Sequence, residues 1–91
     1  MTLGKRLLEL RELGGLSAAE LGLLAGLSDS IVRMIESGTR KNPVASTVAQ
    51  LAVVVGDDGS YLLGLGKRPS KQTVVTAVNR ARSRKRLGDA A

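Results

Sequence analysis

Residues 17–38 read SAAELGLLAGLSDSIVRMIESG, and this stretch decides the fold. Ser17 is followed three residues later by Glu20, a capping-box pattern that is typical of the start of a helix. Gly26 comes where that helix has to end, because glycine adopts the left-handed backbone conformation at little cost. We therefore predict a helix that starts at Ser17 and ends at Gly26.

A second helix is predicted immediately afterwards, over residues 28–37, with Ser28 as its N-cap and Gly38 at its end. Two helices that cross steeply over so short a turn need a small residue at their contact, and Gly22 supplies it. The positions expected to face inward are apolar: Leu21, Ala25, Leu27, Val32 and Ile35. The positions expected to face outward on the second helix are polar, with 29, 33 and 37 one turn apart: Asp29, Ser30, Arg33 and Ser37.

The rest of the chain adds helical patterns and no convincing strand. Apolar spacing predicts a helix over 3–13, another over 45–55, and a short one over 60–65. Polar residues and an Asn-Pro pair predict a loop over 39–43. The sequence thus predicts an all-α fold, a compact five-helix bundle, in residues 1–66.

Charge divides the chain into two parts. Residues 1–66 carry six basic and seven acidic side chains, a net charge of −1. Residues 67–91 carry eight basic side chains and one acidic side chain, a net charge of +7. We interpret 1–66 as the domain and 67–91 as a basic C-terminal extension. Such an extension indicates a polyanionic partner, which can be DNA, RNA or an anionic membrane surface.

The extension has three interpretations at this stage. It can be a flexible basic arm along DNA. It can be a sixth helix that docks through Val74, Val78 and Ala81, which share one helical face. It can also be a disordered, solubilising tail.

Composition argues against several classes of function. The chain has no Cys and no His, so we expect no disulfide framework, no metal site and no His-based catalysis. With no credible pair of carboxylates in a pocket, we expect no catalytic residues, no cofactor and no enzyme. The longest apolar run is five residues and no signal peptide is visible, so we expect a cytoplasmic protein without a membrane partner. The single aromatic residue, Tyr61, argues against a platform for single-stranded nucleic acid.

The ordered set of motifs resembles the lambda-repressor-like, Cro/C1-type helix-turn-helix domains. The resemblance runs from about Leu3 to Leu65, and its pieces are Arg11-Glu12, Gly15-Leu16-Ser17, Ala25-Gly26-Leu27-Ser28, Ile35-Glu36-Ser37-Gly38 and Arg40-Lys41-Asn42-Pro43. It implies that the third helix enters the major groove of double-stranded DNA, usually from a two-fold homodimer. The implied function is a transcriptional regulator, nucleoid-associated in the cytoplasm, of the phage-repressor, Cro-like or antitoxin type.

The resemblance also implies the site residues. The candidates for base contact are Asp29, Ser30, Arg33 and Ser37. The candidates for contact with the DNA backbone in the matched region are Ser17, Ser28, Thr39, Arg40, Lys41 and Asn42. The basic charge of the extension, outside the matched region, adds Arg82, Arg84, Lys85 and Arg86. Three positions depart from the family pattern: Ala18 stands for a common Gln, Asp29 for a basic or amide residue, and Val44 for a capping Ser.

Several of these candidates have a second, purely structural interpretation. Arg33 can read guanine, or it can pair with Asp29 one turn away on a solvated surface. Asp29 can accept from cytosine N4, or it can favour the helix dipole. Ser28 can bind DNA or act only as an N-cap, and the 39–43 segment can be a solvated loop.

A rival function of another class is also open. The same fold can serve as a protein-interaction module, an antitoxin or adaptor, with residues 67–91 as the element that docks on a protein partner.

Overall fold

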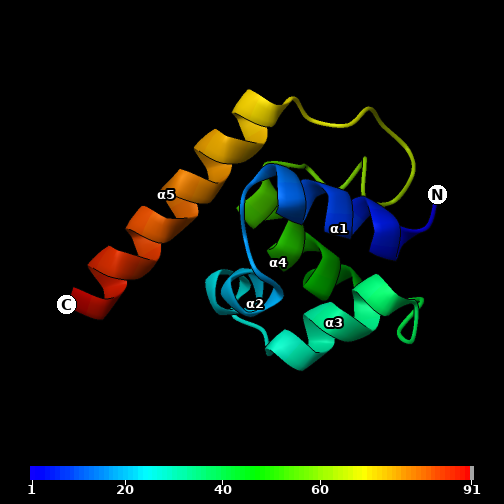
Figure 1. Cartoon of the computed structure of the whole chain (residues 1–91), viewed down its shortest axis with the longest axis horizontal. Coiled ribbons are helices and arrows are strands. Elements are labelled where there is room, and N and C mark those ends of the chain that lie inside the picture. The colour runs from blue at the N-terminus through cyan, green and yellow to red at the C-terminus, as the bar shows by residue number, and fades with distance from the viewer. Residues whose placement is uncertain (91) are drawn as a thin grey trace.

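The computed structural model of this protein describes residues 1–90 and the side chains up to Gly88. Within that part, all regular structure is helical: α1 (Leu3–Leu13), α2 (Ala18–Ala25), α3 (Asp29–Ser37), α4 (Ala45–Val55) and α5 (Lys71–Ala90) (Figure 1). The predicted all-α fold, a bundle of five helices, is confirmed, but its fifth helix lies in the extension and not within residues 1–66. No helix in the described chain combines the length and the apolar character that crossing a bilayer requires.

The predicted short helix at 60–65 is wrong, because this segment consists of tight turns. Gly59 and Gly64 take positive φ angles of 98° and 80°, which a helix does not allow. The carboxylate of Asp57 accepts from the backbone N–H groups of Tyr61 and Leu62 at 3.3 and 3.0 Å. These side-chain bonds satisfy the backbone in a turn conformation and compete with the helical ladder. The fifth helix is therefore α5.

The first three helices start at hydroxyl caps, of which Ser17 and Ser28 were predicted above. Thr2, Ser17 and Ser28 each accept a hydrogen bond from the backbone N–H three residues later, at 3.2, 3.0 and 3.2 Å. Val44 precedes α4 without a side-chain cap, as its apolar side chain dictates. The starts of these helices thus follow from local sequence alone.

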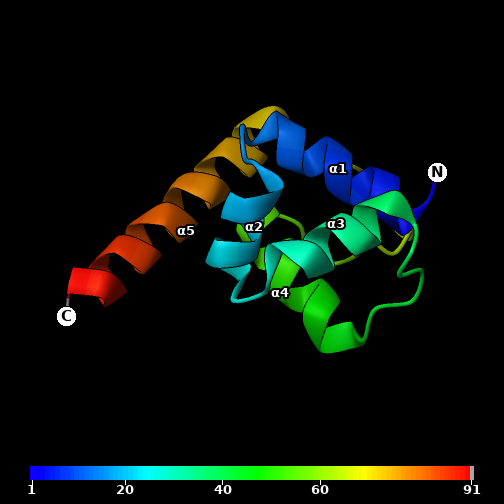
Figure 2. The same cartoon turned by 60° about the horizontal axis from the view of Figure 1, so that its bottom comes forward.

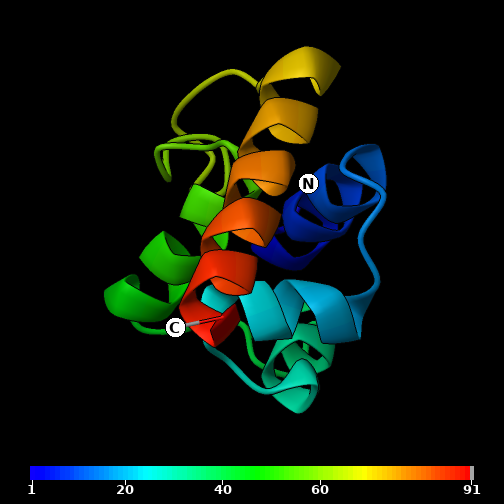
Figure 3. The same cartoon turned by 90° about the vertical axis from the view of Figure 1, so that its left-hand side faces the viewer.

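All five helices contribute to one hydrophobic core. Its buried residues are Leu7, Leu10, Leu16, Leu21, Ala25, Val32, Ile35, Val48, Leu51, Ala52, Val54, Val55, Leu62, Val74, Val78 and Ala81. The last three belong to α5, so the chain beyond residue 70 is a helix that packs on the bundle. In Figure 3, α5 lies in front of the bundle, with α4 on one side of it and α1 and α2 on the other side, and it contacts all three helices. A side chain at Gly56 would come within 2.9 Å of the Thr73 carbonyl oxygen, so a glycine lets α4 and α5 approach.

The connection from the bundle to α5 is held by a polar cluster on α1. The Tyr61 hydroxyl donates to the carboxylate of Glu9, and Arg68 contacts the same carboxylate at 3.2 Å. The hydrogen bond from Tyr61 holds the pKa of Glu9 below its ordinary value, and the same bond raises the pKa of Tyr61. The sole aromatic side chain therefore packs and anchors the turn segment.

Candidate nucleic-acid interface

The turn between α2 and α3 has the predicted geometry. Gly26 is left-handed with φ of 75°, and the N–H of Leu27 donates to the Gly22 carbonyl at 2.8 Å. A side chain at Gly22 would lie 2.9 Å from the Leu27 carbonyl oxygen, closer than real side chains come. The two glycines therefore allow α3 to cross α2 steeply and stand at the edge of the bundle (Figure 2).

One face of α3 is buried and the opposite face is polar. Val32 and Ile35 point into the core and are almost completely inaccessible. Ser30, Arg33 and Ser37 are exposed, and Asp29 is half-buried at the start of the helix. The structure thus brings all four predicted base-contact residues together along the exposed side of α3.

Arg33 and Asp29 form an i,i+4 ion pair, which the sequence left open as the alternative to base contact. Arg33 Nη2 lies 3.3 Å from Asp29 Oδ2, and the two side chains are 66% and 43% exposed. Such an exposed pair contributes only about 0.3–0.5 kcal/mol, because water and salt screen it. The pair exists in the free protein, and little free energy is needed to open it.

The hydroxyl groups at the start of α2 and at the two ends of α3 are partly engaged. Ser17 and Ser28 accept their capping hydrogen bonds, which leaves the hydroxyl hydrogen of each outside the cap. Ser37 bonds to the Met34 carbonyl at 3.2 Å and to the Thr39 hydroxyl at 3.0 Å, so it also shapes the end of the helix.

The loop that follows α3 is exposed from Thr39 to Asn42 and carries two basic side chains, Arg40 and Lys41. The backbone N–H of Arg40 donates to the Met34 carbonyl at 2.9 Å, which ties the loop to the last turn of α3. The predicted backbone-contact residues of this loop therefore lie directly beside the C-terminal end of α3.

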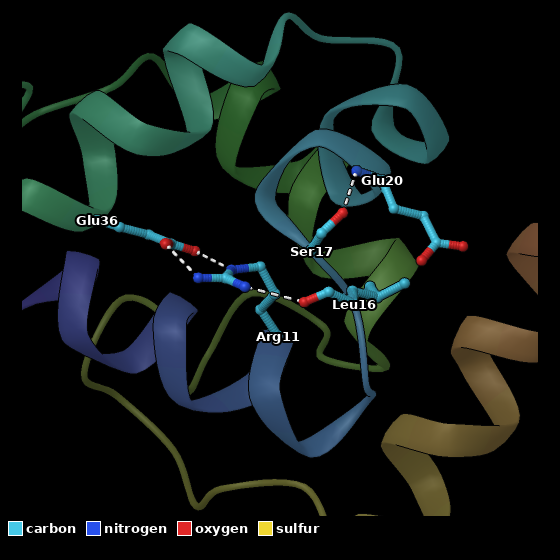
Figure 4. A network of polar contacts seen from close by, with 5 residues as sticks. All are labelled: Arg11, Leu16, Ser17, Glu20 and Glu36. Atoms are coloured by element: carbon cyan, nitrogen blue, oxygen red, sulfur yellow. Dashed lines mark hydrogen bonds and ion pairs between the residues drawn. The ribbon is translucent and has the colours of Figure 1, made fainter.

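A clamp between α1 and α3 was not predicted from the sequence. Arg11 donates from Nε and Nη2 to the two carboxylate oxygens of Glu36, at 2.7 and 2.9 Å (Figure 4). Its third nitrogen donates to the Leu16 carbonyl at 2.9 Å. The hydrogen bonds that Arg11 donates to the Glu36 carboxylate raise the pKa of Arg11. Both residues stand in the quoted motifs, but their separation of 25 positions hides the contact.

The capping box at the start of α2 is only half formed. Ser17 accepts from the N–H of Glu20, but the Glu20 carboxylate turns to α5 instead (Figure 4). Arg82 donates to its two oxygens from Nε and Nη2, at 2.8 and 3.0 Å. This bond holds the pKa of Glu20 below its ordinary value. Arg82, predicted to contact DNA, is therefore engaged within the protein.

The other predicted contact residues of the extension lie apart from α3. Arg84, Lys85 and Arg86 are exposed on the last turns of α5. Arg86 contacts the Ser83 hydroxyl at 3.5 Å. The candidates thus form two groups, one along α3 and its loop and one on α5, with α2 between them (Figure 1).

Comparison with known proteins gives one match. A protein family described as "Helix-turn-helix domain" matches residues 2–60, which cover α1 to α4 and the following turn. No curated protein and no solved structure matches the chain.

Proposed function

Because this chain belongs to the helix-turn-helix domain family, we propose that it binds double-stranded DNA as a sequence-specific transcriptional regulator. In this proposal α3 lies in the major groove. The subtype is Cro/C1, and the protein acts as a homodimeric repressor of the phage, Cro-like or antitoxin type.

One observation carries the proposal: α3 is fixed to the bundle by Val32 and Ile35 and presents a polar, exposed side to solvent. The major groove of B-DNA is about 12 Å wide and admits an α-helix of this kind. The Arg11–Glu36 clamp supports it, because two parallel hydrogen bonds hold the C-terminal end of α3 on α1. A helix held in this way meets DNA with little further loss of entropy.

We assign roles from the chemistry of each side chain. Arg33 exchanges Asp29 for guanine O6 and N7, to which a guanidinium donates two hydrogen bonds. Asp29 then accepts from cytosine N4, and the hydroxyls of Ser30 and Ser37 contact neighbouring base edges. Phosphate contacts are assigned to Ser17 at the start of α2 and to the hydroxyl, amide and basic groups at the two ends of α3: Ser28, Thr39, Arg40, Lys41 and Asn42.

We propose a homodimer because a single α3 helix contacts only one turn of the major groove. Two copies related by a two-fold axis would place two α3 helices about 34–36 Å apart, in successive turns of the major groove. The exposed side chains of Leu63 and Leu65, in the turn segment before α5, favour contact with a second copy.

The alternative function is a protein-interaction module. The exposed leucines Leu23 on α2 and Leu87 on α5 favour it, because apolar side chains on neighbouring elements suit a protein surface.

Selection from a pool of random duplexes tests the proposal. The full chain should enrich an inverted repeat, bind it more tightly than random duplex, and sediment with it as a dimer. If no duplex is bound even at low salt, DNA binding is wrong and the protein-interaction module takes its place.

A further inference from the structure

The basic residues of α5 gather at the end that lies near α2. α5 starts beside the C-terminal end of α1 and runs toward the side of the molecule that carries α2 and α3 (Figures 1 and 3). Five of its six basic residues fall between positions 80 and 86: Arg80, Arg82, Arg84, Lys85 and Arg86. Positive charge therefore increases along α5 toward the proposed DNA-binding side.

These residues sort onto two faces of α5. Arg82, Lys85 and Arg86 line a groove together with Glu20, Leu23 and Leu24 of α2. Arg80 and Arg84 line a different groove, together with Val53 at the end of α4. The helical repeat explains the division, because residues three or four apart share a face.

The Arg82–Glu20 pair fixes this end of the helix. Ala81 is the last buried residue of α5 within the described side chains, and residues 83–88 are exposed. Beyond Ala81, the core therefore does not hold the helix. Two parallel hydrogen bonds from one guanidinium to one carboxylate restrict both distance and orientation. The pair sets the direction in which the last two turns of α5 leave the bundle.

Basic groups lie on two sides of α3, one group directly beside it and one beyond α2. Arg40 and Lys41 directly follow the C-terminal end of α3. The second half of α5 lies on the side of the N-terminal end of α3, with α2 between the two helices (Figures 1 and 2). Phosphates line both edges of the groove that a recognition helix enters, so basic groups on two sides of the helix suit contact with both edges.

We infer that the end of α5 is a phosphate-binding brace for the DNA site of α3. Lys85 and Arg86 bind the DNA backbone, while Arg82 and Glu20 are positioning residues that hold these two side chains beside α2. Arg80 and Arg84, on the face toward α4, take no part. This inference rests on the proposed function and narrows the four DNA contacts expected on the extension to two.

The salt dependence of binding tests the brace. Each neutralised phosphate steepens the log–log dependence of affinity on salt by about 0.9. The variant K85Q/R86Q should flatten this slope by about 1.8 on specific and random duplexes alike. The matched control K71Q/R80Q also removes one lysine and one arginine from exposed positions of α5, and should change the slope much less. Equal flattening by the two variants would overturn the inference, because it would mean that only net charge matters.

The substitution Glu20→Gln gives a second test, because net charge alone and the positioning role predict opposite changes in DNA affinity. The substitution removes a negative charge, so an effect of net charge alone would strengthen DNA binding. If Glu20 positions the brace, the variant binds more weakly and has a flatter salt slope, and it has no such effect in the K85Q/R86Q background. A loss of stability alone lowers the melting temperature but leaves the slope of the folded protein unchanged. Stronger binding by E20Q, or a slope equal to that of the parent, overturns the positioning role.

Different experimental results would contradict the proposed DNA binding and the proposed phosphate contacts of α5. If the parent chain binds no duplex, the proposed function is wrong. If the parent binds and K85Q/R86Q keeps its full salt slope, the function stands and the brace is wrong; a protein partner is then the alternative occupant of that end of α5.

Discussion

At the scale of single residues, burial decides what an arginine does. Arg11 and Arg33 both pair with a carboxylate, but the side chains of the Arg11–Glu36 pair are 17% and 10% exposed, against 66% and 43% for Arg33 and Asp29. Solvent screens the exposed pair, and its members remain available to a ligand. The sheltered pair is satisfied within the protein and acts as structure.

The Arg33→Ala variant should lose specific binding and keep its fold. We expect a loss of about 1–3 kcal/mol at the selected site and much less on random duplex, because a base reader contributes little to non-specific binding. The melting temperature should not change, since the Arg33 side chain is exposed. Titrations of both duplexes measure this, with Lys67→Ala as a control for the loss of one exposed charge. An equal loss on both duplexes would contradict base reading by Arg33.

The Glu36→Gln variant should instead be less stable. Removing the charge weakens two hydrogen bonds and leaves the guanidinium of Arg11 without its counter-ion, at a cost of about 1.5–3 kcal/mol. Urea denaturation followed by circular dichroism measures the change. The matched control is Glu12→Gln, an exposed carboxylate on the same helix as Arg11. A similar midpoint for E36Q and E12Q would show that the clamp does not stabilise the fold.

At the scale of elements, two junctions orient α2 relative to its neighbours α3 and α5. The first is the left-handed turn at Gly26, which sets the crossing of α2 and α3. The second is the Arg82–Glu20 contact, which joins α2 to α5 across 62 positions of sequence. One junction is a backbone conformation and the other is an ion pair, so they respond to different perturbations.

Two substitutions at Gly26 should separate backbone strain from packing. A Cβ at this position meets only Gln50 Nε2 at 3.7 Å, an ordinary contact, so space is not the obstacle. Gly26→Val should cost about 1–3 kcal/mol, because a β-branched residue is disfavoured at φ of 75°. Gly26→Asn should cost clearly less, because Asn tolerates the left-handed region. Thermal melts of both variants measure this, and equal melting temperatures would contradict the assigned turn.

The α2–α5 junction should weaken in acid. The bond to Arg82 holds the pKa of Glu20 below its ordinary value of 4.5 in the folded protein. A carboxyl group with a lowered folded pKa contributes stability above its unfolded pKa and loses that stability as the pH falls through the folded value. The difference in unfolding free energy between the parent and E20Q should therefore shrink between about pH 6 and pH 3. A difference that stays constant over this range would contradict the prediction.

At the scale of the whole molecule, α5 is part of the core. Val74, Val78 and Ala81 are almost as buried as the core leucines Leu7 and Leu10 of α1 and Leu21 of α2. Full burial of a valine-sized side chain contributes about 1.5–3 kcal/mol, and small domains have only about 5–15 kcal/mol in total. The stability of the bundle thus depends on the same helix that carries six of the fourteen basic side chains.

Two truncations should separate these roles. A chain that ends at Gly66 loses the three buried side chains and exposes the core beneath α5, so its melting temperature should fall strongly. A chain that ends at Arg82 keeps those side chains and the bond to Glu20, so it should melt close to the parent. Circular dichroism melts compare the three chains. If truncation after Gly66 leaves the melting temperature unchanged, α5 does not stabilise the bundle.

The amino-acid sequence alone determined the local features. Ser17 and Ser28 as caps, Gly26 as the turn, and the polar outer side of α3 all depend on residues within four positions of one another. Caps, left-handed turns and helix faces arise from backbone geometry over a single turn, so sequence spacing suffices to predict them. The uneven distribution of charge along the chain is also a property of sequence.

Only the tertiary structure decided the distant partners of Arg11, Glu20 and Arg82 and the form of the last third of the chain. The Glu20 carboxylate can cap the start of α2 or bind Arg82, which is distant in sequence. The packing of α5 brings Arg82 close, and the carboxylate binds Arg82. The segment at 60–65 has helical spacing, but the Asp57 carboxylate satisfies its backbone in turns. The extension is a helix because the bundle offers its apolar face a place to pack. In each case competing local states differ by little free energy, and contacts between residues far apart in sequence choose between them.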